Sequence, residues 1–275
     1  MKDHGSKDFK VGFIGGGHIC EAITRGIIIS GYVDPGMINI STLEAERREK
    51  LHKQLGVVTN LSNVDIAKTV DILFLSVRPL ELLSVCEEIS KSLDNKTTVI
   101  TVAAGINTDD IKIKLGGYKN LIRIMPNLPA RVGSSTTVVY RDKECDDQHY
   151  GRAKKFMKGF GEIIEIEKEE LIDPITVLSG SAPAYYMMIA DALIDYGVSE
   201  GIPKETCTRL VLDTMEGAAQ WGMHGQEEPK DLWPKVVTKG GITATGMEVY
   251  NKKGLLNIFV EGLKAATEKA RSISK

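Results

Sequence analysis

The chain has few cysteines, and they are widely spaced. Cys20, Cys86, Cys145 and Cys207 include no C-x-x-C pair, and no histidine lies at ligand spacing from them. This scarcity argues against a zinc site and against a disulfide framework. We therefore expect four buried thiols, no metal and a reducing compartment.

The chain also lacks a dominant charge and a long apolar run. Its 35 basic and 37 acidic residues give a formal net charge of −2, so no electrostatic footprint for nucleic acid or an anionic membrane is present. No run approaches the ~18 apolar residues of a membrane span, and the first ten residues contain no apolar segment typical of a secretion signal. We expect a cytoplasmic protein that binds neither nucleic acid nor membranes.

What the sequence does contain is a change of pattern near residue 170, and its 275 residues suit two domains. Apolar strand patterns, spaced by helical stretches, occur at 11–14, 37–41, 57–58, 71–77, 97–103, 121–125, 136–140 and 162–165. Long helical patterns follow at 183–200, 204–221, 230–238 and 255–274. This order predicts an α/β fold, in which a Rossmann-type doubly wound sheet over residues 1–167 precedes an all-helical domain over 168–275.

The first strand runs directly into a glycine cluster, in the sequence VGFIGGGHIC at residues 11–20. A strand that feeds a glycine turn and then a helix presents backbone N–H groups to an anionic ligand. We expect Gly15, Gly17, His18 and Ile19 to bind a dinucleotide, with Cys20 at the third position of the G-x-G-x-x-G/A pattern. The alternative is a turn without a ligand, which uses glycine for the same positive φ.

The second strand ends at Ser41-Thr42 with no carboxylate at its tip. In NAD-binding folds an acidic residue there accepts from the ribose 2′-hydroxyl, so its absence favours NADPH over NADH. Arg47 and Arg48 follow on the next helix, where a guanidinium can reach a 2′-phosphate. The alternative is that both belong to the solvated face of that helix.

Later strand ends carry further candidates, because ligands of open α/β sheets lie at the carboxyl ends of the strands. Arg78 follows an apolar strand, and Asn127 lies between two prolines that stiffen its backbone, so its amide is expected to face a nicotinamide or a substrate. A structural Asx-turn is the alternative for Asn127. The cofactor-binding candidates here, together with Ser41, are Val77, Arg78, Pro79, Ala103, Ala104 and Asn127.

The helical half has broad apolar faces. One helix alone carries Ala184, Met187, Met188, Ala190, Ala192, Leu193 and Ile194. A helical hairpin cannot bury that much surface by itself, so we expect a homodimer built through the C-terminal helices. The alternative is that these faces pack on the first domain.

Taken in order, these motifs resemble the pyrroline-5-carboxylate reductase family over nearly the whole chain. Residues 12–20 are similar to its GxGxMA turn, 77–79 to its VKP motif, 103–105 to its AAG motif and 123–130 to its RxMPNTPA motif. Residues 180–185 are similar to its GSGPAY motif, and 191–193 to EAL. The resemblance implies NAD(P)H-dependent reduction of 1-pyrroline-5-carboxylate to L-proline, with NADPH as cofactor and NADH as the alternative. It also implies a helical dimerisation and substrate domain, with active sites formed between two subunits, often in rings of dimers.

The family's carboxylate-binding loop, SPGGTT, resembles residues 238–243 with departures. Gly240 and Gly241 are expected to donate backbone N–H groups to the substrate carboxylate, and Thr243 to bond the imine nitrogen as the catalytic residue. Lys239 replaces the usual serine, Ile242 replaces the first threonine, and the proline is missing. Lys239 either adds a cation for the carboxylate or points into solvent. These departures leave two alternatives open, a reductase for a different cyclic imino acid and a catalytically silent nucleotide-binding homologue.

Overall fold

The computed structural model describes residues 9–59 and 61–273 of the chain. They fall into two compact units, which are described separately. Residues up to Pro183 and from Thr267 onward form the first unit, and Ala184–Ala266 form the second.

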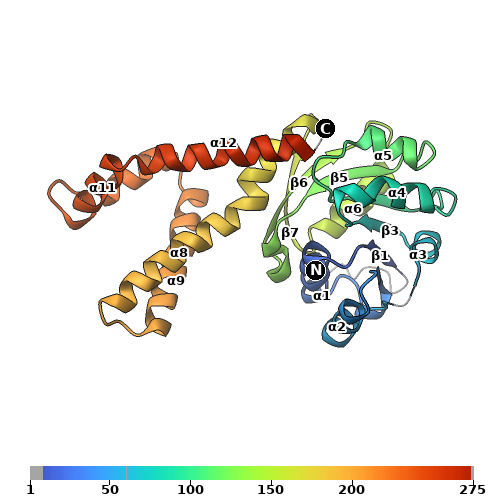
Figure 1. Cartoon of the computed structure of the whole chain (residues 1–275), viewed down its shortest axis with the longest axis horizontal. Coiled ribbons are helices and arrows are strands. Elements are labelled where there is room, and N and C mark those ends of the chain that lie inside the picture. The colour runs from blue at the N-terminus through green and yellow to red at the C-terminus, as the bar shows by residue number, and fades with distance from the viewer. Residues whose placement is uncertain (1–8, 60, 274–275) are drawn as a thin grey trace. The chain divides into compact units, whose positions relative to one another are not determined.

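The described residues of the first unit form a seven-stranded sheet in the order β2-β1-β3-β4-β5-β6-β7 (Figure 1). The strands are β1 (Val11–Ile14), β2 (Ile38–Ser41), β3 (Ile72–Leu75), β4 (Thr98–Thr101), β5 (Leu121–Met125), β6 (Ser135–Arg141) and β7 (Gly161–Ile166). All neighbours are parallel except β5 and β6, which are antiparallel because a short connection with a 3₁₀ helix, rather than a crossover, joins them. The predicted residues 57–58 form no strand, and Val58 makes only an isolated bridge to Asn39.

Helices cover both faces of this sheet, as the predicted doubly wound fold requires. They are α1 (His18–Ser30), α2 (Ala45–Leu55), α3 (Asn63–Thr69), α4 (Pro79–Ile89), α5 (Thr108–Lys114) and α6 (Asp147–Met157). Alternate side chains of a strand point to opposite faces, so Phe74 belongs to one core cluster while Leu73 and Leu75 belong to the other. The first cluster contains the stacked pair Phe13 and Phe74, whose ring centroids lie 4.6 Å apart.

A close helix contact fixes α1 against the connection between β5 and β6. A Cβ atom on Gly26 would lie 2.2 Å from the carbonyl oxygen of Ala130 and 2.7 Å from the Cβ of Phe160. Only glycine fits there without a shift of backbone. This approach packs α1, which carries the glycine turn at its start, against the 3₁₀ helix Leu128–Val132.

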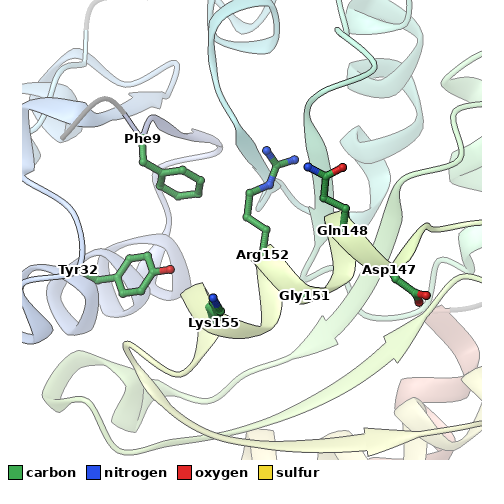
Figure 2. A pocket seen from close by; sticks show the side chains of 7 residues that line it. All are labelled: Phe9, Tyr32, Asp147, Gln148, Gly151, Arg152 and Lys155. Atoms are coloured by element: carbon green, nitrogen blue, oxygen red, sulfur yellow. The ribbon is translucent and has the colours of Figure 1, made fainter. Parts of the chain in front are cut away.

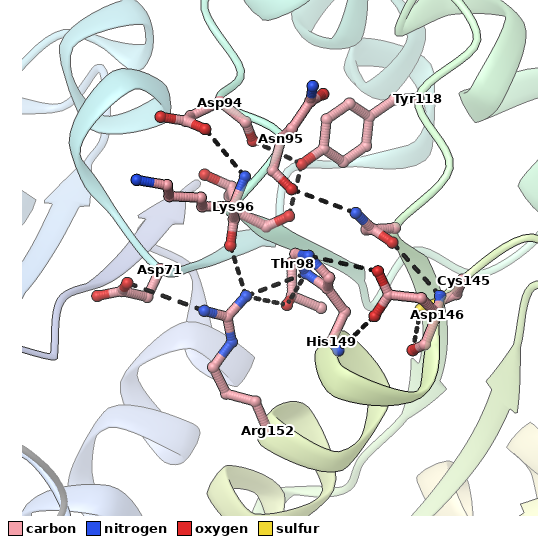
Figure 3. A network of polar contacts seen from close by, with 12 residues as sticks. Asp71, Asp94, Asn95, Lys96, Thr98, Tyr118, Cys145, Asp146, His149 and Arg152 are labelled. Carbon is pink, nitrogen blue, oxygen red and sulfur yellow. Dashed lines mark hydrogen bonds and ion pairs between the residues drawn. The ribbon is translucent and has the colours of Figure 1, made fainter.

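A polar network lies where β4 begins, at the opposite edge of the sheet from the glycine turn (Figure 3). The His149 Nδ1 lies 2.9 Å from Thr98 Oγ1 and 3.0 Å from Arg152 Nη2. Burial, together with the nearby Arg152 guanidinium, holds the pKa of His149 below its usual range. Beside it, Phe9 and Tyr32 face Arg152 and Lys155 of α6 across a cavity of about 420 Å³ (Figure 2).

The remainder of the chain is helical. A continuous helical run at Glu169–Ser199 contains α7 (Ile172–Ile175), a π-helical segment (Thr176–Ser181) and α8 (Ala182–Ser199). It is followed by α9 (Lys204–His224), α10 (Pro229–Leu232), α11 (Ile242–Lys252) and α12 (Leu255–Ile273). The sequence did not predict α11 as a helix of its own. The long helices leave large apolar side chains exposed in the single chain, among them Met187, Met188 and Leu193.

Candidate active site

The glycine turn lies at the carboxyl end of β1, in contact with the residues that follow β3. Gly15 has φ +106°, and a Cβ there would lie 2.5 Å from the carbonyl oxygen of Ser76. The Ser76 hydroxyl donates to the carbonyl of Gly15 at 2.8 Å, and the Gly15 N–H donates to the carbonyl of Ser41 at 2.9 Å. The turn is therefore fixed between the ends of β2 and β3.

The helix α1 begins without a side-chain cap. Gly17 is its N-cap residue, and the first helical bond runs from the Glu21 N–H to the Gly17 carbonyl at 3.1 Å. Gly17 and His18 are exposed, and no atom lies within 4 Å of a Cβ built on Gly17. Ile19, by contrast, is half-buried and packs on the core. The first N–H groups of an α-helix have no intrahelical partner, so this end can bind an anion such as a phosphate.

Cys20 takes the third position of the glycine pattern as a small buried residue. It is fully buried, and burial raises the pKa of its thiol to about 12. The thiol is therefore neutral and serves packing between α1 and the sheet. All four cysteines are free and buried.

The two arginines of α2 make different contacts. Arg47 is only 15% exposed, and its guanidinium donates to the carbonyls of Gly16 and Gly17, so it does not lie on the solvated face of α2. Arg48 does bond the loop after β2, donating to the carbonyls of Thr42 at 2.7 Å and Leu43 at 2.9 Å. Arg48 is thus the arginine at the position where a ribose 2′-phosphate is expected.

Ser41, a predicted cofactor contact, is buried at the end of β2. Its hydroxyl donates to Asn63 Oδ1 at 2.5 Å, and its carbonyl accepts from the glycine turn. Asn63 in turn donates to Glu88 Oε2 at 2.9 Å. Ser41 therefore contacts the glycine turn through its backbone, and its side chain ties β2 to α3.

The segment after β3 presents Arg78 to solvent. Its side chain is 82% exposed and pairs with Glu81 in the first turn of α4. Glu81, through its hydrogen bond and charge, and more weakly Glu44 after β2, raise the pKa of Arg78. Val77 is half-buried, and Pro79 is the first residue of α4. Arg78 is therefore an exposed cation at the same end of the strands as the glycine turn.

Asn127, after β5, is buried and makes hydrogen bonds to two elements. Its Nδ2 lies 3.3 Å from both the carbonyl oxygen and the hydroxyl of Ser179, and its Oδ1 accepts from the Thr136 N–H at 3.3 Å. This pattern differs from an Asx-turn, which closes on the residue's own backbone two positions on. At the end of β4, Ala103 is buried and Ala104 is half-buried, so only small side chains lie at that strand end.

A buried charge next to this edge was not among the sequence candidates. Arg123 of β5 is 5% exposed; its Nη1 donates to Glu169 Oε1 at 2.9 Å, and its Nη2 lies 3.5 Å from Asp173 Oδ1. Glu169 also accepts from the N–H and the hydroxyl of Thr108. An arginine inside an otherwise apolar strand was the signal that could have located this ion pair. It joins β5, α5 and the start of the long helical run.

In the second unit, the predicted carboxylate loop leads directly into α11. Gly240 has φ +70°, and Gly241 is the N-cap residue of α11, again with no side-chain cap. The first helical bond runs from the Thr245 N–H to the Gly241 carbonyl at 3.2 Å, so Thr243 lies in the first turn of a helix rather than in a loop. A Cβ on Gly241 would lie 2.3 Å from Thr238 Oγ1, which explains why glycine is needed there.

The surroundings of Thr243 are apolar on one side. Thr243 borders a cavity of about 730 Å³ with Trp221, Trp233 and Met247. Lys239 is exposed, and Ile242 is 96% exposed. Within the described part of the chain, no three His, Cys, Asp or Glu side chains gather as a metal site would require.

Comparison with known proteins finds similarity along nearly the whole length of the chain. Residues 169–273 match a family profile described as pyrroline-5-carboxylate reductase dimerisation, and residues 10–105 match one described as NADP oxidoreductase coenzyme F420-dependent. The pyrroline-5-carboxylate reductase of Escherichia coli (strain K12) is 32% identical over 266 residues, covering 97% of this chain and 98% of that protein.

Two solved structures share the fold over both units. The Plasmodium falciparum pyrroline carboxylate reductase, crystallised with NADP bound, has a TM-score of 0.89 and 26% identity, covering 98% of this chain and 100% of that one. The pyrroline-5-carboxylate reductase of Coxiella burnetii has a TM-score of 0.81 and 31% identity, covering 98% of this chain and 99% of that one.

Proposed function

The chain belongs to the pyrroline-5-carboxylate reductase family, and we propose that it reduces 1-pyrroline-5-carboxylate to L-proline with NADPH as the hydride donor. This reaction is the last step of proline biosynthesis, and the protein is an oxidoreductase acting on a CH–NH bond. The observation that carries the proposal is that the similarity extends over 97% of the chain and so includes both the glycine turn and the helical unit.

The residues at the carboxyl edge of the sheet fit a dinucleotide. Gly15 leaves no room for a side chain, Gly17 leaves open space above the turn, and α1 begins uncapped beside them. We assign the pyrophosphate to the N–H groups of Gly17, His18 and Ile19, while Gly15, whose N–H donates to the Ser41 carbonyl, shapes the turn that the pyrophosphate contacts. The absence of a carboxylate after Ser41, together with Arg48 at the following loop, favours NADPH over NADH.

The neighbouring strand ends complete the cofactor site. Val77, Arg78 and Pro79 border the nucleotide, and the small side chains of Ala103 and Ala104 allow a ring to approach the sheet. Asn127 holds the loop after β5 in place through Ser179. When bound, NADPH supplies the hydride that reduces the carbon of the C=N bond.

The start of α11 is assigned to the substrate. The N–H groups of Gly240 and of the first turn of α11 bind the carboxylate, because the uncapped N-terminus of a helix favours an anion. The Gly241 N–H instead donates to the Thr238 carbonyl at 2.9 Å, so Gly241 shapes the turn. The Thr243 hydroxyl bonds the imine nitrogen, and the exposed Lys239 adds a cation for the carboxylate. An imine nitrogen is basic enough to be protonated without a strong acid, so these residues chiefly position the substrate.

The active protein is proposed to be a homodimer through its C-terminal helices, within a larger ring of dimers. Met187 and Met188 are 55% and 62% exposed in the single chain, within the region that matches the dimerisation profile. The run Glu169–Ser199 is long and apolar enough to span a membrane by length and composition alone. We propose that its apolar face lies in the dimer interface and not in a bilayer, and we place the protein in the cytoplasm.

An NADPH-oxidation assay with a panel of cyclic imino acids tests the proposal. Turnover of 1-pyrroline-5-carboxylate in preference to the other imines is the expected result. Preference for another cyclic imino acid would show that the proposed substrate is wrong, and we would attribute the change to Lys239 and Ile242. Tight NADPH binding without turnover of any imine would contradict the proposed activity and leave a nucleotide-binding homologue.

A further inference from the structure

Arg47 reaches from α2 back to the glycine turn. Its Nε donates to the carbonyl of Gly16 at 2.6 Å, and its Nη2 donates to the carbonyl of Gly17 at 3.2 Å. These are consecutive carbonyls of the turn, and one planar guanidinium bonds both. An ammonium group on a flexible stem cannot reproduce this fork.

Arg47 is itself held in place by Glu21 of α1. Its Nη1 lies 2.8 Å from Glu21 Oε2, while Glu21 Oε1 accepts from Arg25 at 2.9 Å and from Arg131 at 3.1 Å. These four residues are named the Glu21 cluster. Burial opposes ionisation of Glu21, but the hydrogen bonds from Arg25 and Arg47 outweigh it and hold the pKa of this carboxyl below its usual range. The carboxylate is therefore charged and orients the guanidinium.

The carbonyls of the turn are all accounted for by donors from the protein. Arg47 bonds that of Gly16 and shares that of Gly17 with the helical N–H of Glu21, and the Ser76 hydroxyl bonds that of Gly15. Occupied carbonyls cannot turn toward a ligand, whereas the N–H groups at the start of α1 have no intrahelical partner. The donors around the turn thus decide which backbone groups face outward.

We propose that Arg47, oriented by Glu21, is a positioning residue of the cofactor site that keeps the Gly16 carbonyl away from the phosphates and supports the helical bond that holds the Gly17 carbonyl. This inference rests on the proposed function, because it takes NADPH as the ligand of the turn. The pyrophosphate is common to NADPH and NADH, so Arg47 supports both cofactors equally. Arg48, which bonds the loop after β2, acts instead on the choice between them.

The rival explanation is that Arg47 acts only as a positive charge near the phosphates. The two explanations differ for Glu21→Gln, which removes a negative charge and raises the net positive charge around the turn. A pure charge effect predicts tighter binding of both cofactors in this variant. Positioning predicts weaker binding, because Arg47 loses the partner that orients it. They differ again for Arg47→Lys, which keeps the charge and loses the fork.

The experiment measures dissociation constants of NADPH and NADH by titration calorimetry on the full chain, with kcat and KM for NADPH beside them. Arg47→Lys is expected to weaken both cofactors about 10- to 100-fold, with little change in their ratio. Glu21→Gln is expected to weaken both as well, with kcat at saturating NADPH retained. Unchanged affinity in Arg47→Lys, a changed NADPH:NADH ratio, or tighter binding in Glu21→Gln would overturn the proposal.

Three further variants make the result specific. Lys50→Gln, on the exposed side of α2, is the matched control and should bind as the wild type does. Arg48→Gln should lower the NADPH:NADH preference. Ser76→Ala frees the Gly15 carbonyl without altering a charge, and it should weaken both cofactors about 2- to 10-fold. It tests the same idea where a Glu21 cluster variant fails to fold, and an unchanged affinity would contradict it.

The outcomes separate this inference from the proposed function. A wild type that binds NADPH but reduces no imine contradicts the proposed function, while the variant affinities still decide the role of Arg47. Wild-type turnover with unaltered cofactor affinity in the Arg47 and Ser76 variants contradicts only the inference. A wild type that binds neither cofactor contradicts both.

Discussion

The side-chain amide of Asn127 donates to the Ser179 carbonyl at the point where Pro183 removes the regular α-helical donor. Its Nδ2 lies 3.3 Å from the Ser179 carbonyl oxygen. In a regular α-helix that carbonyl would accept from the N–H of residue 183, but Pro183 has none. The loop after β5 and the π-helical segment Thr176–Ser181 therefore complete each other's hydrogen bonds.

Asn127→Ala is expected to lower the free energy of unfolding by about 1–3 kcal/mol, because it removes the buried side chain that hydrogen-bonds Ser179 and the Thr136 N–H. Urea denaturation followed by circular dichroism measures the change. Asn251→Ala, on an exposed position of α11, is the control and should stay within about 0.5 kcal/mol of the wild type. Equal stabilities of the two variants would show that the Ser179 carbonyl does not depend on Asn127.

Alanine at Gly15 and at Gly17 should have different consequences. Gly15→Ala forces a Cβ against the Ser76 carbonyl at positive φ and is expected to destabilise the fold by about 1–3 kcal/mol. Gly17→Ala meets no protein atom, so it should leave Tm nearly unchanged while raising the KM for NADPH, since its methyl group occupies the space assigned to the pyrophosphate. Thermal unfolding and NADPH kinetics, measured on both variants, check this. Unaltered NADPH kinetics in Gly17→Ala would contradict the assignment of the pyrophosphate to the turn.

Thr243→Ala should lower kcat/KM for 1-pyrroline-5-carboxylate about 10- to 100-fold, because the imine nitrogen loses its hydroxyl partner. Thr243→Ser retains the hydroxyl and should keep most of the activity. Steady-state kinetics at saturating NADPH measures both. Full activity in the alanine variant would contradict the catalytic role of Thr243.

The stability of the fold should depend on His149 in mildly acid solution. Burial and Arg152 lower the pKa of His149 in the folded state, and they outweigh the Asp146 carboxylate, 3.8 Å from Nε2, and a backbone hydrogen bond at Asn95, which both raise it. Between this lowered pKa and the ordinary histidine value of 6.5, the unfolded chain binds more protons than the folded one, so stability should fall as pH falls through that window. His149→Gln should flatten this dependence in chemical denaturation at several pH values. An equally steep dependence in the variant would assign it to other groups.

Replacing Met188 by Asp should shift the protein toward monomers, because a carboxylate would be buried in the proposed interface of the helical unit. Light scattering coupled to size-exclusion chromatography gives the mass of wild type and variant. Lys91→Asp, exposed in the first unit, is the control and should leave the mass unchanged. A variant that remains fully dimeric would place Met188 outside the interface.

Patterns of local sequence predicted the sheet well, and long-range contacts explain where they did not. The apolar run 121–125 coincides with β5, and the glycine cluster lies at the end of β1. The direction of β6 could not be read from its own residues, because it depends on the short connection from β5. Residues 57–58 are too few to pair as a strand beyond the single bridge to Asn39.

The site was predictable as a set of strand ends, but the partners of its side chains were not. A guanidinium on α2 can reach several atoms, and only the fold shows that Arg47 bonds the glycine carbonyls while Arg48 bonds the loop after β2. Similarly, Gly240 and Gly241 marked a turn, but the helix that begins at Ile242 was hidden by the glycines before it. The contact of Ser179 with Asn127 could not be predicted from Ser179 itself, because it depends on Pro183 and on the position of Asn127 in the fold.

The occupied carbonyls of the glycine turn also set what it rejects. A surface that offers only donors has no partner for an ammonium group or a hydrated cation, whereas the oxygens of a diphosphate accept from those donors. Fragments of the cofactor should therefore bind only if they carry phosphates. ADP-ribose should compete with NADPH, whereas adenosine, which lacks a phosphate, should not.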